Sequence, residues 1–375
     1  MKVGWQTKVF AEVLEIRNGK NQSEVESKSG KYPIYGSAGK CMGFANSYIC
    51  DANSTIIGRK GTINSPIFID EPFWNVDTAF GLVAKDGLLP KFLHYFSLSY
   101  DFTEHNRGTT IPSLVKTDLQ QIKIPLPPLP EQERIVGILD EAFDGIAKAK
   151  ALAEANRHNA RALFQSHLQS VFSQKGEGWV EQTLGETYDV RDGTHDSPKY
   201  HSKGFPLITS KNLKRHGLSF DDVKLINEAD FNKINERSVV HRGDVLFAMI
   251  GTIGNPTLVM VDPNFAIKNV ALFKIPKGQS GAFLKLYLDS GWVISKMINE
   301  AKGTTQKFVG LGYLRSFPIY LPPLEIQMKV VSDLEELSAE TQRLESLYQS
   351  KLDALDELKK SLLHQAFSGN LITHP

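Results

Sequence analysis

An internal repeat limits the folds open to this chain, because a duplicated sequence folds into two copies of one structure. Gly4-Trp5 and Gly178-Trp179 begin two similar stretches that lie 174 residues apart. Two later motifs recur 195 residues apart: Gly108-Thr109-Thr110 with Gly303-Thr304-Thr305, and Leu126-Pro127-Pro128-Leu129 with Leu321-Pro322-Pro323-Leu324. The chain is therefore two copies of one plan, and the two offsets make the middle of the first copy about 21 residues shorter.

Each copy ends in a long amphipathic segment. After Pro130, apolar or small residues recur in alternating steps of four and three, which is a heptad seam. Asn156 and Lys351 interrupt the two seams at the same point. The predicted seam residues are Ile135, Leu139, Ala142, Ile146, Ala149, Ala153, Ala160 and Leu163 in the first copy, and Val330, Leu334, Leu337, Thr341, Leu344, Tyr348, Leu355 and Leu358 in the second.

The seams predict two long helices. Proline pairs prevent an earlier start, and each helix spans about 43 residues, roughly 65 Å. The first seam is rich in Ala and the second in Leu, so small residues of one helix fit large residues of the other. Taken alone, the seams leave open a coiled-coil spacer of another purpose.

Two globular segments precede the helices, at about residues 1–128 and 176–322. In both, β-branched and aromatic residues alternate with Gly, Asn and Asp, which is typical of short strands and turns. The stretches FLHYFSLSYDF and AFLKLYLDSGWVISKMIN have a helical pattern. We therefore predict an α+β fold class.

Composition and charge restrict the functional classes. The net charge is +1, but residues 1–130 carry +2, residues 176–323 carry +3 and residues 324–375 carry −4. This distribution favours a polyanion at the globular segments and a protein partner at the helices.

Cys41 and Cys50 lack a CxxC spacing, which argues against zinc and suits a reducing cytosol. With no apolar run of membrane length and no signal peptide at the start, we expect a soluble, cytoplasmic protein.

The sequence lacks the motifs of enzymes that methylate adenine or bind nucleotides. The Pro-Pro pairs lie between leucines, so they cannot form the Asn/Asp-Pro-Pro-aromatic loop of an adenine methyltransferase, and no GxGxxG or P-loop pattern is present. Asp222-Val223-Lys224 and Glu357-Leu358-Lys359 have part of a nuclease spacing, but such triplets are common by chance. His195 and Asp196 have no identifiable Ser or Cys nucleophile. We therefore expect no catalytic activity and no metal site in this chain.

The order and duplication of the motifs carry a family resemblance. IPLPPLPEQERIV, beginning at Ile124, resembles the entry to a conserved helix, and RGTTIPSL at Arg107–Leu114 resembles the segment just before that entry. YPIYGSAG at Tyr32–Gly39, RDGTHDSPKY at Arg191–Tyr200 and GFPLITSKNL at Gly204–Leu213 resemble target-recognition segments. Over essentially its whole length the chain resembles the specificity subunits of type I restriction–modification systems. Glu325-Ile326-Gln327 departs from Pro130-Glu131-Gln132 of the first copy.

The resemblance implies an architecture. Residues 1–128 and 176–322 would be tandem target-recognition domains of mixed α/β structure. Residues 129–175 and 323–375 would be conserved spacer helices, packed as an antiparallel coiled coil in an internal pseudo-twofold repeat.

The resemblance also implies a function. The chain would recognise a bipartite double-stranded DNA target, one half-site per domain, with a gap set by the helices. It would direct two adenine-methyltransferase subunits and the restriction/translocase subunits to that target. S-adenosylmethionine, Mg²⁺ and ATP would bind only those partners.

The geometry of double-stranded DNA agrees with two recognition domains joined by long helices. Base edges are distinguishable in the major groove, and half-sites on one face of DNA lie about 34 Å apart, a separation that the helices could span. Because the two domains differ between their shared ends, the target should be asymmetric. Residues shared by both copies, such as the Gly-Thr-Thr motifs, Trp5 and Trp179, are expected to be structural.

Polar residues of Gly-rich loops are the expected DNA contacts, because such loops approach phosphates and bases closely. The candidates are Lys31, Tyr32, Tyr35, Ser37, Arg59, Lys60, Asn64 and Arg107 in the first domain, and Thr194, His195, Lys199, Tyr200, Ser210, Lys211, Asn212, Lys214 and Arg215 in the second.

Two other functions stay open from the sequence. One is the reader subunit of a related system, in which a single partner chain carries both methyltransferase and nuclease. The other is a coiled-coil adaptor that binds protein, for which no salt-sensitive, sequence-dependent DNA affinity is expected.

Overall fold

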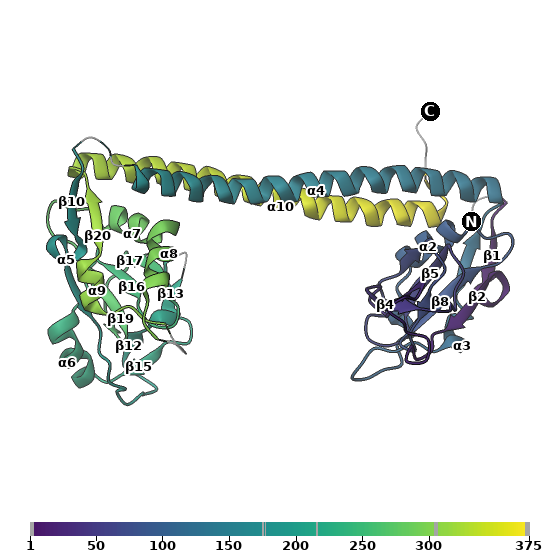
Figure 1. The fold of residues 1–375 in the computed structure, drawn as a ribbon, viewed down its shortest axis with the longest axis horizontal. Helices are drawn as coiled ribbons and strands as arrows, with labels where there is room; N and C mark the ends of the chain where they lie inside the picture. The colour runs from purple at the N-terminus through teal and green to yellow at the C-terminus, as the bar shows by residue number, and fades with distance from the viewer. Residues whose placement is uncertain (1–3, 175, 177, 215–216, 304–306, 372–375) are drawn as a thin grey trace. The chain divides into compact units, whose positions relative to one another are not determined.

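The structure is a computed structural model that describes residues 4–174, 176, 178–214, 217–303 and 307–371. The chain divides into two compact units, one formed by Met1–Glu154 with Gln349–Pro375 and the other by Ala155–Tyr348. Each unit contains one globular domain and parts of two long helices (Figure 1).

The first domain has three small sheets. A four-stranded antiparallel sheet has the order β2-β8-β5-β6, a three-stranded sheet has the order β4-β3-β7, and β1 pairs with β9. The elements are β1 (Gln6–Val9), α1 (Phe10–Val13), β2 (Leu14–Asn18), β3 (Tyr32–Tyr35), β4 (Cys41–Ala45), β5 (Ser54–Gly58), β6 (Ile67–Ile69), β7 (Trp74–Asn75), β8 (Ala79–Ala84), α2 (Pro90–Ser99), the 3-10 helix η1 (Phe102–His105), α3 (Lys116–Leu119) and β9 (Lys123–Leu126).

The second domain repeats this topology. Its sheets have the orders β11-β19-β16-β17, β15-β12-β18 and β10-β20, and β13 and β14 form an additional hairpin. The elements are β10 (Val180–Thr183), α5 (Leu184–Thr187), β11 (Asp189–Asp192), β12 (Phe205–Ile208), η2 (Ser210–Asn212), β13 (Leu213–Lys214), β14 (Gly217–Leu218), β15 (Lys224–Ile226), α6 (Glu228–Ser238), β16 (Val245–Ala248), β17 (Gly254–Leu258), β18 (Ala266–Ile267), β19 (Val270–Lys274), α7 (Gly281–Asp289), α8 (Gly291–Glu300), α9 (Leu311–Ser316) and β20 (Pro318–Leu321).

The matching topology confirms the repeat and the predicted α+β fold class. One of the two central strands of each large sheet, β5 or β16, is buried along its whole length, as expected for strands covered on both faces. The second domain is longer because β13, β14 and α6 are inserted around β15.

In each unit one short helix lies between the large sheet and the long helices (Figure 1). In the first unit this is α2, whose Phe92 packs in one core with Leu139 and Ala366 of the long helices. In the second unit it is α7, whose Phe283 shares a core with Leu168 and Leu334. The domain cores therefore continue into the helices that follow them.

The long helices are α4 (Leu129–Ser173) and α10 (Leu324–Ser368), of 45 residues each. Both begin directly after the proline pairs, and the amides of Gln132 and Gln327 donate to Pro128 O and Pro323 O in the first turn. Gly369, with φ +79°, ends α10 in the left-handed conformation that favours glycine.

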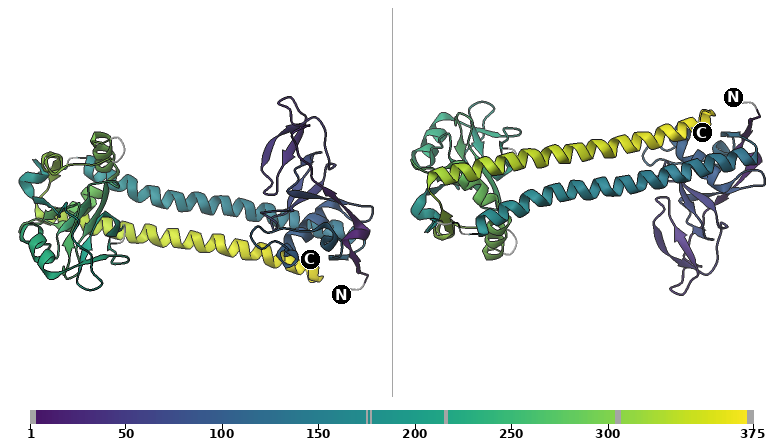
Figure 2. Two further views of the ribbon diagram at one scale, coloured as in Figure 1. Left: turned by 90° about the horizontal axis from the view of Figure 1, so that it is seen from below. Right: turned by 90° about the horizontal axis from the view of Figure 1, so that it is seen from above.

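The two long helices run side by side and antiparallel within each unit (Figure 2). In the first unit, Ile135 near the start of α4 shares a core with Leu363 near the end of α10, and Lys150 pairs with Asp356. In the second unit, Arg161 pairs with Glu345. This confirms the antiparallel coiled coil.

Most predicted seam residues are covered. Those at most 8% exposed are Ile135, Leu139, Ile146, Ala153, Ala160, Leu334 and Thr341, and those half-buried are Ala142, Ala149, Val330, Leu337, Leu344, Tyr348 and Leu355. Asn156 is half-buried, whereas Lys351 is exposed and Leu352 takes the buried position beside it.

The last predicted seam residue of each helix is wrong. Leu163 is 54% exposed and Leu358 is 46% exposed. Each lies four heptads after the first seam residue, and a straight helix drifts by about 20° per heptad, hence roughly 80° in all. The seam moves to Phe164 and Leu168 in α4 and to Leu363 in α10.

Candidate nucleic-acid interface

The first group of candidates in the first domain lies on β3 and at the residue before it. Lys31 is exposed, and the Tyr32 ring centroid lies 4.9 Å from that of Tyr48. Tyr35 is half-buried edge-on against Phe73, and burial raises the pKa of its hydroxyl. Tyr32 therefore offers an aromatic surface next to a cation, whereas Tyr35 belongs mainly to the core.

The second group in this domain follows β5. The amides of Arg59 and Lys60 both donate to Thr78 O, at 2.8 and 3.1 Å. The Arg59 guanidinium lies 5.7 Å from the centroid of the Phe80 ring, while Lys60 is exposed. The Ser37 hydroxyl lies next to Gly61, so Ser37 and the turn that follows Lys60 are brought together from separate parts of the sequence.

Two other candidates of the first domain are engaged in its own fold. Asn64 donates to Asp101 Oδ1 at 3.1 Å and accepts from the Phe102 amide at 2.9 Å, which fixes the start of η1. Arg107 Nε donates to Asp118 Oδ2 at 2.8 Å and thereby lowers the pKa of that carboxyl. These bonds place both residues in the frame of the domain.

In the second domain, Thr194 and His195 begin a loop that is fastened to the turn between β18 and β19. The Thr194 amide donates to Ile267 O at 3.0 Å, and the Asn269 amide donates to Thr194 O at 3.1 Å. Lys268 Nζ donates to Ser197 Oγ at 2.7 Å. The loop goes on to Lys199 and Tyr200, which are exposed, Tyr200 by 47%.

His195 lies in a polar cluster around the buried carboxylate of Asp192, which is 5% exposed. His195 Nε2 lies 2.9 Å from Asp192 Oδ2, and its Nδ1 lies 2.8 Å from Asn269 Oδ1. Arg237 of α6 binds the other oxygen of Asp192. A hollow of about 300 Å³ adjoins the cluster, between this loop and α6.

The remaining candidates surround η2. Ser210 is half-buried, Lys211 and Lys214 are exposed, and Arg215 lies outside the described residues. Asn212 is wrong as a DNA contact, because it is 6% exposed and its amide is used within the domain. Its Oδ1 accepts from the Thr209 amide and hydroxyl, both at 3.0 Å, and its Nδ2 donates to Ser219 O at 3.1 Å.

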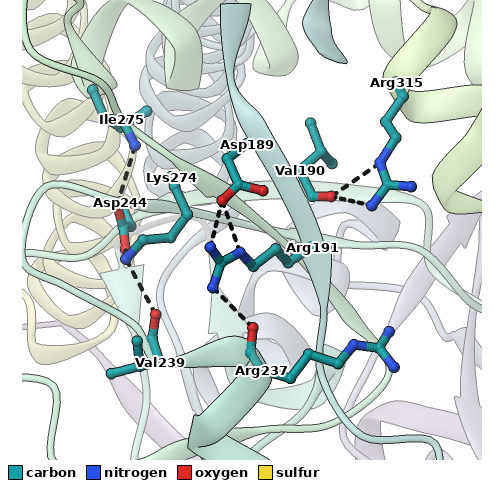
Figure 3. A network of polar contacts seen from close by, with 9 residues as sticks. All are labelled: Asp189, Val190, Arg191, Arg237, Val239, Asp244, Lys274, Ile275 and Arg315. Carbon is teal, nitrogen blue, oxygen red and sulfur yellow. Dashed lines mark hydrogen bonds and ion pairs between the residues drawn. The ribbon is translucent and has the colours of Figure 1, made fainter.

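A framework network behind the second-domain loops was missed from the sequence (Figure 3). Arg191 binds Asp189 through Nε and Nη2, which lowers the pKa of the Asp189 carboxyl, and its Nη1 donates to Arg237 O at 3.0 Å. Lys274 joins Asp244 to Val239 O. In the first domain the matching Arg17 binds Glu15 and Asp51 and donates to Ile49 O.

A buried glutamine anchors each long helix and was also missed. Gln132 is fully buried, accepts from the Leu89 amide at 2.9 Å and donates to Gly87 O and Pro127 O. Gln327 is also fully buried, accepts from the Ser280 amide at 3.0 Å and donates to Pro322 O. Because both copies have a Gln after the proline pair, the repeat itself carried this signal.

Among residues 4–174, 176, 178–214, 217–303 and 307–371, no group of three or more His, Cys, Asp or Glu is arranged to hold a metal ion. None of the helices in those ranges combines the length and the apolar composition that crossing a bilayer requires.

Comparisons with known proteins follow the same division of the chain. A family model described as the type I restriction modification DNA specificity domain matches residues 2–157 and 176–352. The type I restriction enzyme EcoBI specificity subunit of Escherichia coli is 22% identical over 347 residues, which cover 84% of this chain and 73% of that protein. The MjaVIII specificity subunit of Methanocaldococcus jannaschii is 22% identical over 401 residues, covering 98% and 93%.

Solved structures share the fold. A chain described under complex assembly and conformational transition of the type I R-M system has a TM-score of 0.80 at 19% identity, covering 99% of both chains. The HsdS subunit from Thermoanaerobacter tengcongensis has a TM-score of 0.63 at 18% identity, covering 99% of this chain and 98% of that one.

Proposed function

This chain belongs to the family of type I restriction modification DNA specificity domains, and we propose that it is the subunit that recognises the DNA target of such a system. The observation that carries the proposal is the duplicated scaffold. Two domains with one topology present different exposed residues, as a protein needs when it recognises two different half-sites.

The first domain, residues 1–128, recognises one half-site, and the second domain, residues 176–322, recognises the other. Lys31, Tyr32, Ser37 and Lys60 are accessible in the first domain. In the second domain Thr194, His195, Lys199, Tyr200, Lys211 and Lys214 are at least partly accessible. Positive and hydroxyl groups of this kind bind phosphates, and base edges supply the sequence information.

The helices set the unspecified gap and bind the modification subunits. Support comes from residues 324–375, which include α10 and carry a net charge of −4, and from the packing of each helix into its own domain core. Insertion of seven residues into both α4 and α10 should lengthen the gap and leave both half-sites unchanged. Altered half-sites with the original gap would contradict this role.

Catalysis belongs to the partner subunits in this proposal. Two adenine-methyltransferase subunits bring S-adenosylmethionine, and the restriction/translocase subunits bring the ATP and Mg²⁺ chemistry. The sequence motifs support this division, since no nucleotide-binding pattern is found in this chain. The comparisons do not favour a reader with a fused methyltransferase–nuclease partner, nor a coiled-coil adaptor.

A genome-wide map of adenine methylation tests the proposal. A methylation-free host would express this chain with its methyltransferase partner, and each of the two alone. We expect one asymmetric bipartite motif, methylated only when both are present. An active partner without any motif would refute target recognition, and methylation by this chain alone would refute its non-catalytic role.

A further inference from the structure

The two domains share one loop whose framework is matched bond for bond. In the first domain Gly61, with φ +84°, follows the end of β5, and its amide donates to Pro112 O at 2.9 Å. In the second domain Gly251, with φ +76°, follows the end of β16, and its amide donates to Lys307 O at 3.0 Å. Both positive φ values favour glycine, so the turn is conserved between the copies.

A second pair of hydrogen bonds fixes the register of this loop. The Leu114 amide donates to Arg59 O at 2.8 Å, and the Val309 amide donates to Met249 O at 3.0 Å. Lys60 therefore matches Ile250, and the residue paired with each across the loop is Ser113 in the first domain and Phe308 in the second. We call Lys60 with Ser113, and Ile250 with Phe308, the tips of the two domains.

The position before each tip faces the interior. Met249 is 3% exposed, and Arg59 is half-buried with its guanidinium over Phe80 and donating to Asp77 O at 3.4 Å. The tips themselves face outward: Lys60 is exposed, and Phe308 is 40% exposed beside the half-buried Ile250. The same outward position thus has a cation in one domain and an apolar surface in the other.

Among the described residues, no hydrogen bond or ion pair within the chain holds Lys60 Nζ. Its ammonium group is therefore available to an external acceptor. Phe308 is likewise absent from the hydrophobic cores of its unit, whereas Ile250 packs against one of them. An exposed aromatic side chain on this tip, with the exposed Lys302 and Lys307 near it in the sequence, Lys307 Nζ donating to Ile298 O at 3.2 Å, suits a ligand that is apolar at its centre and anionic around it.

On the basis of the proposed function, we propose that the two tips recognise bases in different ways, one through a positive charge and the other through an apolar surface. Lys60 donates to guanine O6 or N7 in the first half-site, since these adjacent acceptors in the major groove are the preferred partners of lysine. Phe308, supported by Ile250, packs against a thymine methyl group in the second half-site, which is an apolar contact available only at thymine. Shared framework residues cannot distinguish two half-sites, whereas these positions can.

Base analogues test the assignment at single atoms. The probe is a duplex with the target found by methylation mapping, bound to the complex of this chain with its methyltransferase subunits. Replacing each thymine of the second half-site in turn by deoxyuridine removes one methyl group. At one position we expect affinity to fall about 4-fold, the value of one buried carbon. This loss should vanish in Phe308→Ala, persist in Phe308→Leu, and persist in the matched control Lys60→Ala.

In the first half-site, guanines are replaced in turn by 7-deazaguanine, which lacks N7, or by inosine as a control that keeps N7 and O6. Lys60→Ala should lower discrimination against a wrong base at one guanine by about 5- to 150-fold, and where the contact is to N7 that guanine should also become insensitive to the 7-deaza change. Phe308→Ala should leave this response unchanged.

Two results would overturn the inference. One is a deoxyuridine response that is the same in the wild-type complex and in Phe308→Ala at every position. The other is a Lys60→Ala complex that binds all sequences more weakly by one common factor with a shallower salt dependence, which identifies a phosphate contact. Both presuppose target-specific binding, so a failure of the proposed function is recognised separately, by the absence of any preferred duplex.

Discussion

The two domains differ most where the small sheet meets its loops. In the first domain β3 passes through a short turn directly into β4, whereas in the second domain the matching β12 continues through η2 and the β13–β14 hairpin before β15. Helix α6 is a second insertion, and its Arg237 binds Asp192, where the first domain has Asn18. Insertions and unmatched side chains lie together, while the large sheets keep one strand order.

This contrast separates scaffold from recognition surface. Three pairs of residues make matching contacts in the two copies and therefore maintain the fold. They are Gly19 and Gly193, Arg17 and Arg191, and Gln132 and Gln327. Lys60 and Ile250 occupy one backbone position with opposite chemistry. A duplicated protein that binds two different sequences needs this division, because a change at a scaffold position damages the domain without providing new specificity.

The largest effect is expected at the matched glycines. A Cβ at Gly19 would lie 1.8 Å from Val76 O, and a Cβ at Gly193 would lie 2.2 Å from Ile267 O. Gly19→Ala and Gly193→Ala should each destabilise their own domain by about 3 kcal/mol or more, since rigid backbone must move. Urea unfolding followed by hydrogen exchange in each unit measures this. If either variant stayed within about 1 kcal/mol of the wild type, the scaffold would not be equivalent in the two copies.

Acid should affect the first unit more than the second. Burial, and then the positive charges of Lys359 and Lys91, lower the pKa of His94 to about 4. The unfolded chain binds this proton near pH 6.5, so stability is lost as pH falls from about 6.5 to 4, by at most about 3 kcal/mol. The matching position of the second domain is Lys285.

Hydrogen exchange at pH 7 and pH 5 measures this difference, and His94→Gln is the control that removes the titrating group. The interpretation fails if the first unit of His94→Gln keeps the full acid sensitivity of the wild type.

A reciprocal exchange tests the unmatched carboxylate. Asp192→Asn removes the charge that holds Arg237 and His195, and should cost about 1–2 kcal/mol in the second domain. The reverse change, Asn18→Asp, is at an exposed position and should cost less than about 0.5 kcal/mol. Thermal unfolding of the two variants gives the comparison. Equal costs would show that the cluster around Asp192 contributes nothing specific to the second domain.

The smallest effects are expected at the misplaced seam residues. Leu163→Ala and Leu358→Ala should change stability by less than about 0.5 kcal/mol, because both side chains are largely exposed. The buried controls Leu168→Ala and Leu363→Ala should cost about 2–5 kcal/mol. A large loss at Leu163 would restore the strict heptad seam over the full length of α4.

The sequence predicted the repeat, the long helices and the α+β class, because each leaves a pattern along the chain. The match between the two tips and the contacts of single side chains leave no such pattern. The tips match at an offset of 190 residues, between the offsets of 174 and 195, so a gap-free comparison misses Gly61-Thr62-Ile63 and Gly251-Thr252-Ile253. His195 bonds to Asn269, which lies 74 residues away, and spacing along the chain does not encode that contact. Asn212 bonds to the nearby Thr209 and Ser219, but a polar residue in a loop carries no pattern that separates this local role from a DNA contact.

The central claim is that each domain recognises one half-site independently of the other. It is tested most directly by a methylation map of a chain in which residues 176–322 are replaced by residues 1–128, expressed with the methyltransferase partner. Because the long helices are antiparallel within each unit, we predict a symmetric target, made of the first half-site and its inverted copy. An asymmetric motif from a folded, partner-bound chain would contradict the claim.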